Sequence, residues 1–199
     1  MEIKSKHALR SQATRAALVT SARELFAARG YADVATEEIV RSAGVTRGAL
    51  YHQFADKQEL LAAVFEEIEG ELLQELVVRM EGAATTDPLE ALRIGAASFL
   101  QACTRPEVHR VVLLDAPSVL GWERWREIGW RYGMGLTEGA LQAAIDAGQI
   151  ADQPVRPLAH LLLGALDEAA LYVARAPDPD LAREQMGTAL GRLLDGLRG

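Results

Sequence analysis

The stretch TEEIVRSAGVTRGALYHQFADK, residues 36–57, carries the strongest structural signal in the chain. Thr36 can cap a helix, and the two glutamates after it favour the positive end of a helix dipole. Gly44 lies in a tight turn that needs a backbone conformation which a Cβ resists. Thr46 can cap a second short helix over residues 47–53. The pattern predicts two short helices joined by a turn, the helix-turn-helix arrangement.

The apolar residues of this stretch have the spacing to pack both helices onto a preceding helix. They are Ile39, Val45, Leu50 and Phe54, facing Leu25 and Phe26. The second helix then points its other residues away from the core, at the end that enters the major groove in such motifs. Arg47 can form a fork of hydrogen bonds with guanine, and Ala49 is small enough to meet a thymine methyl. Taken singly, Arg47 and Tyr51 would read as ordinary surface residues.

The ordered set of residues resembles the TetR family of bacterial transcriptional repressors from about residue 15 to residue 61. The matching positions are Ala22, Leu25, Phe26, Gly30, Tyr31, Thr36, Ile39, Ala43, Gly44, Val45, Gly48, Leu50, Tyr51, Phe54 and Lys57. The resemblance implies a homodimer that binds a palindromic operator in double-stranded DNA. It also implies that the dimer leaves the operator when a small molecule enters the C-terminal part.

The resemblance implies a set of DNA-contacting residues by position. Thr36, Tyr51 and Lys57 would hold phosphates, whereas Arg47, Ala49 and His52 would face bases or nearby backbone. The whole set expected at the DNA is Thr36, Thr46, Arg47, Gly48, Ala49, Tyr51, His52 and Lys57. Two residues depart from the family pattern, because Val40 replaces the usual Ala and Gln53 replaces a frequent His. The second departure leaves open whether Gln53 contacts DNA.

The charge distribution fits a DNA-binding head on an acidic body. The chain has 199 residues, 49% hydrophobic and 25% charged, which is ordinary for a globular protein. Its net charge is −7, but residues 1–54 contain eight Lys and Arg against five Asp and Glu, a local charge of +3. Because screening limits electrostatic attraction to short range, the local charge governs docking on phosphates.

The chain is predicted to be all-α, with about nine helices, since no region alternates with period two. Residues 1–55 form the expected three-helix head, which is the DNA-binding domain. A fourth helix over residues 56–81 connects it to residues 82–199, the expected ligand-binding and dimerisation domain. Asp56 and Asp87 are predicted to cap the fourth and fifth helices.

Several classes of protein are disfavoured. The longest stretch without a charged residue is Ile94–Thr104, which is too short for a transmembrane helix, and the charged N-terminus does not resemble a signal peptide. A lone cysteine, Cys103, allows no internal disulfide, so we expect a cytoplasmic protein without metal or cofactor. No catalytic motif is present, so we do not expect an enzyme. His160 and Asp167 lie roughly on one helical face, where they could form a polar spot in a pocket.

A segment rich in tryptophan and glycine marks a candidate effector site. Trp122, Trp125 and Trp130 fall within nine residues, and glycines at five nearby positions suggest space beside the indole rings. Apolar cavities with a few polar groups are the usual small-molecule sites. The residues expected at an apolar or aromatic effector are Phe99, His109, Trp122, Trp125, Glu168 and Tyr172. The alternative is an ordinary aromatic core.

The last two helices are predicted to form the dimer interface. Residues 158–173 are too apolar for a helix that exposes one face to solvent. Gly187 and Gly191 permit another helix to approach closely. The interface residues expected are Leu161, Ala165, Gly187 and Gly191; burial within one subunit is the alternative. The predicted function is a ligand-responsive repressor. The alternatives are an activator or architectural protein with the same head, and a small-molecule-transforming helical enzyme.

Overall fold

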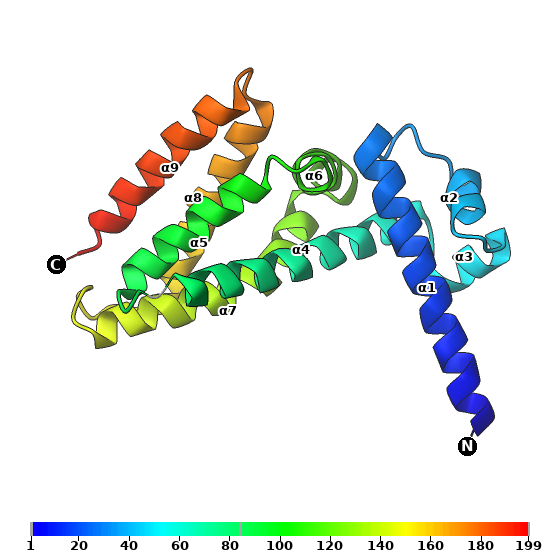
Figure 1. Cartoon of the computed structure of the whole chain (residues 1–199), viewed down its shortest axis with the longest axis horizontal. Helices are drawn as coiled ribbons and strands as arrows, with labels where there is room; N and C mark the ends of the chain where they lie inside the picture. The colour runs from blue at the N-terminus through cyan, green and yellow to red at the C-terminus, as the bar shows by residue number, and fades with distance from the viewer. Residues whose placement is uncertain (1, 84, 199) are drawn as a thin grey trace. The chain divides into compact units, whose positions relative to one another are not determined.

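The computed structural model describes residues 2–83 and 85–198, with side chains from residue 8 onward. In that part of the chain the fold is all-α, with nine α-helices and one π-helical stretch and without β-strands (Figure 1). The all-α prediction is therefore confirmed. The elements are α1 (Glu2–Arg29), α2 (Thr36–Ser42), α3 (Arg47–Gln53), α4 (Lys57–Gly82), α5 (Pro88–Ala102), the π-helical stretch (Val108–Asp115), α6 (Ala116–Leu120), α7 (Trp122–Asp146), α8 (Val155–Arg175) and α9 (Pro179–Asp195).

Local sequence signals set most of the helix boundaries. Gly30 has a φ of +88° and ends α1 in the left-handed conformation that glycine tolerates. Asp56 precedes α4 and accepts a hydrogen bond from the Glu59 N–H at 2.8 Å. Asp87 caps α5 in the same way, accepting from the N–H groups of the second and third residues of that helix. Both aspartate caps were predicted from the sequence and are confirmed.

The cap of α2 differs from the prediction. Thr36 is the first residue of α2 rather than its cap, and the cap position belongs to Ala35. The Glu38 side chain reaches back and accepts a hydrogen bond from the Ala35 N–H at 3.1 Å. The same carboxylate is held by Arg29 at 2.6 Å. A glutamate in the first turn thus satisfies the N–H of the cap residue, while the Glu38 and Ile39 N–H groups, which a capping Thr36 hydroxyl could have reached, bond to the Ala35 carbonyl.

The chain divides into two compact units. The first combines Met1–Ile68 with Pro106–Arg124, and the second combines Glu69–Arg105 with Trp125–Gly199. In the first unit, α1, α2 and α3 pack together around buried Leu18, Phe26, Ile39 and Leu50. This three-helix group is the scaffold that positions the helix-turn-helix.

Several polar contacts fasten residues 106–124 to the rest of the first unit. The Asp115 carboxylate accepts a hydrogen bond from the Tyr31 N–H at 2.8 Å. Arg124 donates two hydrogen bonds to the Glu59 carboxylate, at 2.6 and 2.8 Å. The Gln58 amide also donates to the backbone carbonyl of Val119 at 3.1 Å. The segment that follows α5 is therefore held to both the turn before α2 and the start of α4.

In the second unit, α9 packs against both α5 and α8 (Figure 1). A core of Leu89, Leu141, Ala144, Ile150 and Ala159 joins α5, α7 and α8. The second unit thus buries apolar side chains from helices that are distant in the sequence.

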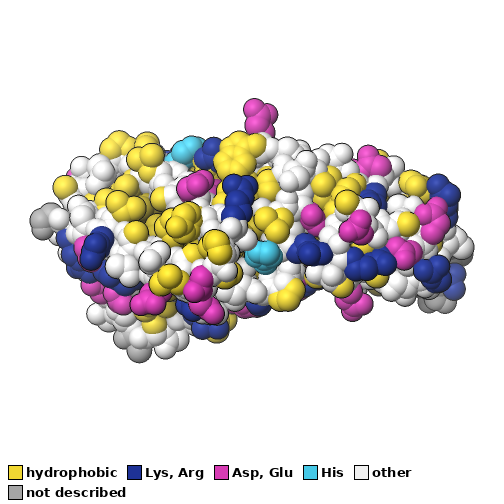
Figure 2. Space-filling model, turned by 90° about the horizontal axis from the view of Figure 1, so that it is seen from above, with side chains coloured by type: hydrophobic (Ala, Val, Ile, Leu, Met, Phe, Trp, Pro, Cys, Tyr) yellow, Lys and Arg dark blue, Asp and Glu magenta, His cyan; other side chains and the backbone are white. Residues whose placement is uncertain are grey.

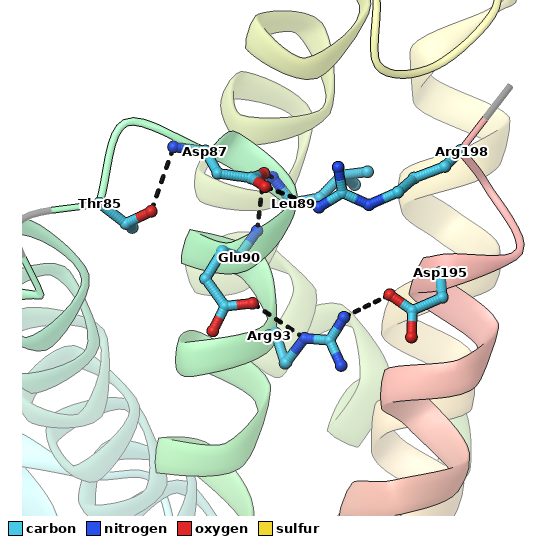
Figure 3. A network of polar contacts seen from close by, with 7 residues as sticks. All are labelled: Thr85, Asp87, Leu89, Glu90, Arg93, Asp195 and Arg198. Carbon is cyan, nitrogen blue, oxygen red and sulfur yellow. Dashed lines mark hydrogen bonds and ion pairs between the residues drawn. The ribbon is translucent and has the colours of Figure 1, made fainter.

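An ion-pair network links the start of α5 to the end of α9 (Figure 3). Arg93 pairs with Glu90 at 3.1 Å and also with Asp195. Arg198 pairs with Asp87 at 2.6 Å, so the aspartate that caps α5 also binds the C-terminal end of the chain. That pairing, together with backbone hydrogen bonds, lowers the pKa of Asp87 to about 2. The network fixes the register between the two helices.

Candidate functional site

The turn between α2 and α3 has the conformation that the sequence predicts. Gly44 has a φ of +66°, a region that other residues rarely adopt. The Thr46 side chain caps α3 by accepting a hydrogen bond from the Ala49 N–H at 3.2 Å. Leu50 and Phe54 are buried, so α3 lies with its apolar face against the head. The predicted helix-turn-helix is therefore present.

The residues at the start of α3 form an open surface. Thr46, Arg47, Gly48, Tyr51 and His52 are exposed, and Ala49 is half-buried. A Cβ built on Gly48 would meet only the Thr46 hydroxyl, at 3.9 Å, so nothing covers this part of the helix. The free N–H groups of a helix N-terminus favour anions such as phosphate. The surface has the chemistry of a nucleic-acid interface.

Arg47 already has partners on this surface. Its guanidinium forms an ion pair with Glu37 at 3.1 Å and lies 5.6 Å from the centre of the Tyr51 ring. A hydrogen bond with Tyr51 is the main cause that raises the pKa of Arg47, and the negative charge of Glu37 acts in the same direction. Because exposed ion pairs are weak, Arg47 can exchange Glu37 for a guanine edge or a phosphate at little cost.

Lys57 is placed differently from the other residues expected at DNA. Its ammonium donates to the carbonyls of Tyr31 and Val34, at 2.7 and 2.8 Å, and lies 3.9 Å from the centre of the Tyr31 ring. Burial lowers the pKa of Lys57, although Asp115 acts in the opposite direction. Lys57 thus stabilises the turn between α1 and α2 and keeps one N–H for another acceptor.

Thr36 and Gln53 also have partners in the first unit. The Thr36 hydroxyl donates to the Glu37 carboxylate at 3.1 Å. The Gln53 amide donates to the Ser11 hydroxyl of α1 at 2.8 Å, and Gln53 is half-buried. Gln53 therefore fastens the end of α3 to α1.

The residues expected at the effector have different environments. Of these residues, Trp125 is buried, Phe99 and His109 are half-buried, and Trp122 is 48% exposed. His109 and Trp122 belong to the first unit, whereas Phe99 and Trp125 belong to the second. The other two expected residues, Glu168 and Tyr172, lie one turn apart on the exposed side of α8.

A polar cluster in the second unit gathers around Trp130, which the effector prediction left out. The Trp130 indole N–H donates to the Asp167 carboxylate at 3.0 Å, and its ring packs edge-on to His160 with the centroids 4.1 Å apart. The Arg126 guanidinium lies 4.0 Å from the centre of the Trp130 ring. The polar spot expected at His160 and Asp167 therefore includes residues of α7.

Two acids in the second unit are perturbed by burial. Burial, reinforced by the charge of Asp167, raises the pKa of Glu69 to about 8. Burial raises the pKa of Asp167 to about 6, opposed by the Trp130 hydrogen bond and by Arg126. Glu69 had no place in the sequence prediction. Its position four residues after Phe65 and three before Leu72, both buried, is the signal that could have identified it.

The two glycines of α9 lie toward the interior of the second unit. Gly191 is buried, and a Cβ built on it would lie 3.0 Å from a guanidinium nitrogen of Arg93. Gly187 lines a cleft of about 350 Å³ between α5 and α9, together with Arg93, Arg183 and Leu194. A larger residue at 191 would therefore disturb packing inside one subunit.

Large apolar side chains are exposed on the sides of α8 and α9 that face away from the interior of the second unit. Leu161 is 70% exposed, and Tyr172, Leu181 and Leu193 are each about half exposed. Figure 2 shows apolar side chains gathered on the left part of the face in view. By length and composition α8 could cross a membrane, with 39% of its most apolar window buried, but interior helices pass the same test. Exposed apolar stripes on adjacent helices are typical of a protein interface.

A metal centre has little support in the part of the chain with described placement. Those residues contain no group of three or more His, Cys, Asp or Glu side chains that could hold a metal ion. The surface of α3 and the polar cluster around Trp130 are therefore the two candidate sites.

Two family models match the chain. The model described as "Bacterial regulatory proteins, tetR family" matches residues 18–64. The model described as "Tetracyclin repressor-like, C-terminal domain" matches residues 89–197. Both describe regulatory proteins, which confirms the prediction that the chain is not an enzyme.

Similar proteins extend over nearly the whole chain. The TetC protein of transposon Tn10 from Escherichia coli is 27% identical over 176 residues, 86% of each chain. A TetR-family transcriptional regulator from Pectobacterium atrosepticum is 35% identical, covers 96% of both chains and has a TM-score of 0.84. FadR from Bacillus subtilis, solved in complex with stearoyl-CoA, has a TM-score of 0.71 at 20% identity. It covers 92% of this chain and 98% of that one, and this likeness concerns the fold alone.

Proposed function

Because the chain belongs to the TetR family of DNA-binding transcriptional regulators, we propose that it is a repressor controlled by a small molecule. Two copies bind a palindromic operator, and an apolar or aromatic effector bound in the C-terminal part releases them. The observation that carries the proposal is the uncovered N-terminal surface of α3. Because it would bind operator DNA, the protein would act in the cytoplasm.

The DNA-binding role is assigned to residues 1–55, and the α3 surface is its reading face. Arg47 would contact a base edge, while Tyr51 and the Thr46–Gly48 backbone would meet phosphates. Lys57 would add a phosphate contact through its remaining N–H. Residues 56–81 connect this head to residues 82–199, to which we assign effector binding and dimerisation. The two family matches, 18–64 and 89–197, support this division.

The proposed dimer forms through the exposed stripes of α8 and α9. Leu161, Ala165, Glu168 and Tyr172 follow one another at intervals of four, three and four residues, so they share one side of α8. Leu181 and Leu193 extend the apolar surface onto α9. A rigid dimer is needed because the two reading heads must lie about one helical turn of DNA apart, roughly 34–36 Å.

The effector would bind among the apolar and aromatic side chains of the second unit. Trp125 and Phe99 are the candidate apolar contacts there, and the FadR complex shows that a protein of this fold accommodates a ligand with a long apolar chain. Only a difference in affinity between the DNA-competent and DNA-incompetent states can release the operator. DNA must then weaken effector binding by the same factor.

Footprinting on the DNA next to the protein's own gene tests the proposal. We expect protection of an inverted repeat, with affinity that falls steeply with salt. The Arg47→Ala variant should bind roughly ten-fold more weakly and lose preference at one base position in each half-site. Binding without sequence preference would instead favour the architectural alternative. A reporter whose expression falls when the protein is deleted would favour an activator.

A further inference from the structure

The cleft between α5 and α9 is a cavity that the proposed function does not use. Its volume of about 350 Å³ is at the lower end of the range of roughly 300–1,000 Å³ that small-molecule sites occupy. Its lining includes neither Trp125 nor Phe99, the apolar contacts proposed for the effector. Both helices belong to the second unit, so the cleft is formed within one compact part of the chain. It is therefore a candidate for a second binding site.

A glycine inside α9 keeps the cleft open. Gly187 lines the cleft, and a Cβ built on it would meet no atom within 4 Å. Gly187 is not one of the glycines with a positive φ, so its backbone conformation is open to other residues. Glycine destabilises the interior of a helix relative to alanine. Because neither the backbone nor crowding requires Gly187, its effect is to leave space that a longer side chain would fill.

The walls of the cleft are mainly apolar. The apolar lining residues are Ala96, Ala97, Leu100, Leu190 and Leu194. Glu184 and Thr188 of α9 also line the cleft, but both are exposed, so their polar groups can stay in contact with water. A ligand with an apolar body would therefore remove apolar surface from water when it binds here.

A guanidinium lies toward each end of the cleft. The ion pairs in Figure 3 join the start of α5 to the end of α9, so the two helices run antiparallel. Arg93 lies beside Gly191, near the end of α9. Arg183 lies near the start of α9, about 12 Å from Gly191 along the helix axis. The distance between these positions suits a molecule of small size with one charged end.

Arg183 has donors that the protein does not use. One terminal nitrogen of its guanidinium pairs with Asp180 at 3.2 Å, and the Asp180 side chain is 85% exposed. The Arg183 Nε atom is buried and has no hydrogen-bond partner among the described residues. A buried donor without an acceptor is unfavourable, so an anion that accepts from it would be stabilised. Arg93 already pairs with Glu90 and Asp195, which leaves Arg183 as the group that can bind an anion.

We propose that this cleft binds a small organic carboxylate, with the carboxylate group on Arg183 and the apolar body over Gly187. A planar guanidinium presents paired N–H groups that match the two oxygens of a carboxylate. The exposed pair with Asp180 is weak, so Arg183 can exchange it at little cost. The apolar walls favour an aliphatic or aromatic body over an inorganic anion. The inference is independent of the proposed repressor, because the site needs neither DNA nor the effector.

Isothermal titration calorimetry on the full-length protein tests the proposal. The probes are octanoate, cinnamate and hydrocinnamate, each compared with its primary amide, which has nearly the same shape without the charge. We expect at least one carboxylate to bind with a dissociation constant of about 1 mM or tighter, and its amide to bind at least ten-fold more weakly. The melting temperature should rise with the concentration of that carboxylate, because a ligand of the folded state stabilises it.

Two pairs of variants locate the site. Arg183→Gln should weaken carboxylate binding at least ten-fold. Arg192→Gln, the same change at an exposed position of α9 outside the cleft, should not. Gly187→Leu should fill the cleft and abolish binding. Gly139→Leu in α7 is its control, because a Cβ on Gly139 also meets no atom within 4 Å and Gly139 does not line the cleft.

The proposal is overturned if no carboxylate of the series binds, or if the amides bind as tightly as the acids. It is also overturned if Arg183→Gln or folded Gly187→Leu protein binds the carboxylate as the wild type does. Should Gly187→Leu not fold, the result for Arg183→Gln decides alone. All of these measurements are made without DNA, so their failure leaves the proposed repressor standing. Failure to bind any operator would reject the repressor and leave the carboxylate site standing.

Discussion

The Asp115 carboxylate accepts a hydrogen bond from the Tyr31 N–H, although the two residues are 84 positions apart in the chain. Tyr31 begins the turn between α1 and α2, so Asp115 supports the turn that leads into the DNA-binding motif. In the same turn, the Tyr31 carbonyl accepts from Lys57. The turn is therefore held at both its N–H and its carbonyl by side chains from outside it.

Replacing Asp115 should destabilise the first unit. Asp115→Ala leaves the partly buried Tyr31 N–H without its acceptor, and we expect a loss of about 1–3 kcal/mol in the free energy of unfolding. Asp115→Asn keeps a carbonyl acceptor and should lose less. Chemical denaturation followed by circular dichroism measures both variants. Equal stability of Asp115→Ala and the wild type would contradict a supporting role.

Glu37 should restrain DNA binding through Arg47. Glu37→Gln removes the ion-pair partner of Arg47 and a negative charge from the reading face, so operator affinity should rise a few-fold. Asp33→Asn removes the same charge from an exposed position elsewhere in the first unit and should have a smaller effect. Fluorescence anisotropy with labelled operator measures both. If Glu37→Gln raised affinity equally in an Arg47→Ala background, the effect would not pass through Arg47.

Stability should decrease as the pH rises from about 5 to 8. Glu69 and Asp167 have folded-state pKa values of about 8 and about 6, above their usual values of 4.5 and 3.8. The folded state therefore holds these protons more tightly than the unfolded state, and their contribution is complete only below the unfolded pKa values. It is lost as the pH rises through the folded values, on the order of a few kcal/mol in total.

The pH dependence can be assigned with a single variant. Glu69→Gln is neutral at every pH, so its melting temperature should fall less than that of the wild type between pH 5 and pH 8. Glu71→Gln should follow the wild-type curve. Parallel curves for the wild type and Glu69→Gln would show that Glu69 ionises normally in the folded protein.

A charge on the exposed stripe of α8 should break the dimer. Leu161→Glu replaces a large apolar side chain of the proposed interface by a second carboxylate beside Glu168, so dimer affinity should fall at least ten-fold, and operator affinity with it. Val78→Glu in α4 is the matched control, because Val78 is 67% exposed and Leu161 is 70% exposed. Sedimentation velocity measures the assembly state. An unchanged dimer in Leu161→Glu would place the interface elsewhere.

The features predicted best from the sequence are those fixed by near neighbours in the chain. The aspartate caps of α4 and α5, the Thr46 cap and the Gly44 turn each depend on residues within four positions. The Thr36 prediction was wrong because the helix begins one residue earlier than expected, with Ala35 at the cap position and its N–H bonded to the Glu38 side chain. Local rules thus identify where a helix begins more reliably than which side chain caps it.

Contacts between segments that are distant in the chain could not be predicted from the sequence. Lys57 matches a phosphate-binding position, yet its ammonium is held by carbonyls 23 and 26 residues earlier. The Trp130–Asp167 hydrogen bond joins α7 to α8 across 37 residues, and no local pattern encodes it. Glu69 reads as a surface residue in an acidic stretch until its place between Phe65 and Leu72 on one side of α4 is considered.

The environment of Cys103 has a practical consequence. Its thiol is buried and has a pKa of about 12, so at pH 8 almost none of it is the thiolate that reacts with maleimides. As Cys103 is the sole cysteine in the sequence, a second one introduced on the surface can be labelled without first removing it. A spin label at Val78 of α4, which is 67% exposed, would report the distance between the two copies of the proposed dimer by electron paramagnetic resonance. The protein is thus ready for site-directed spectroscopy in its native sequence background.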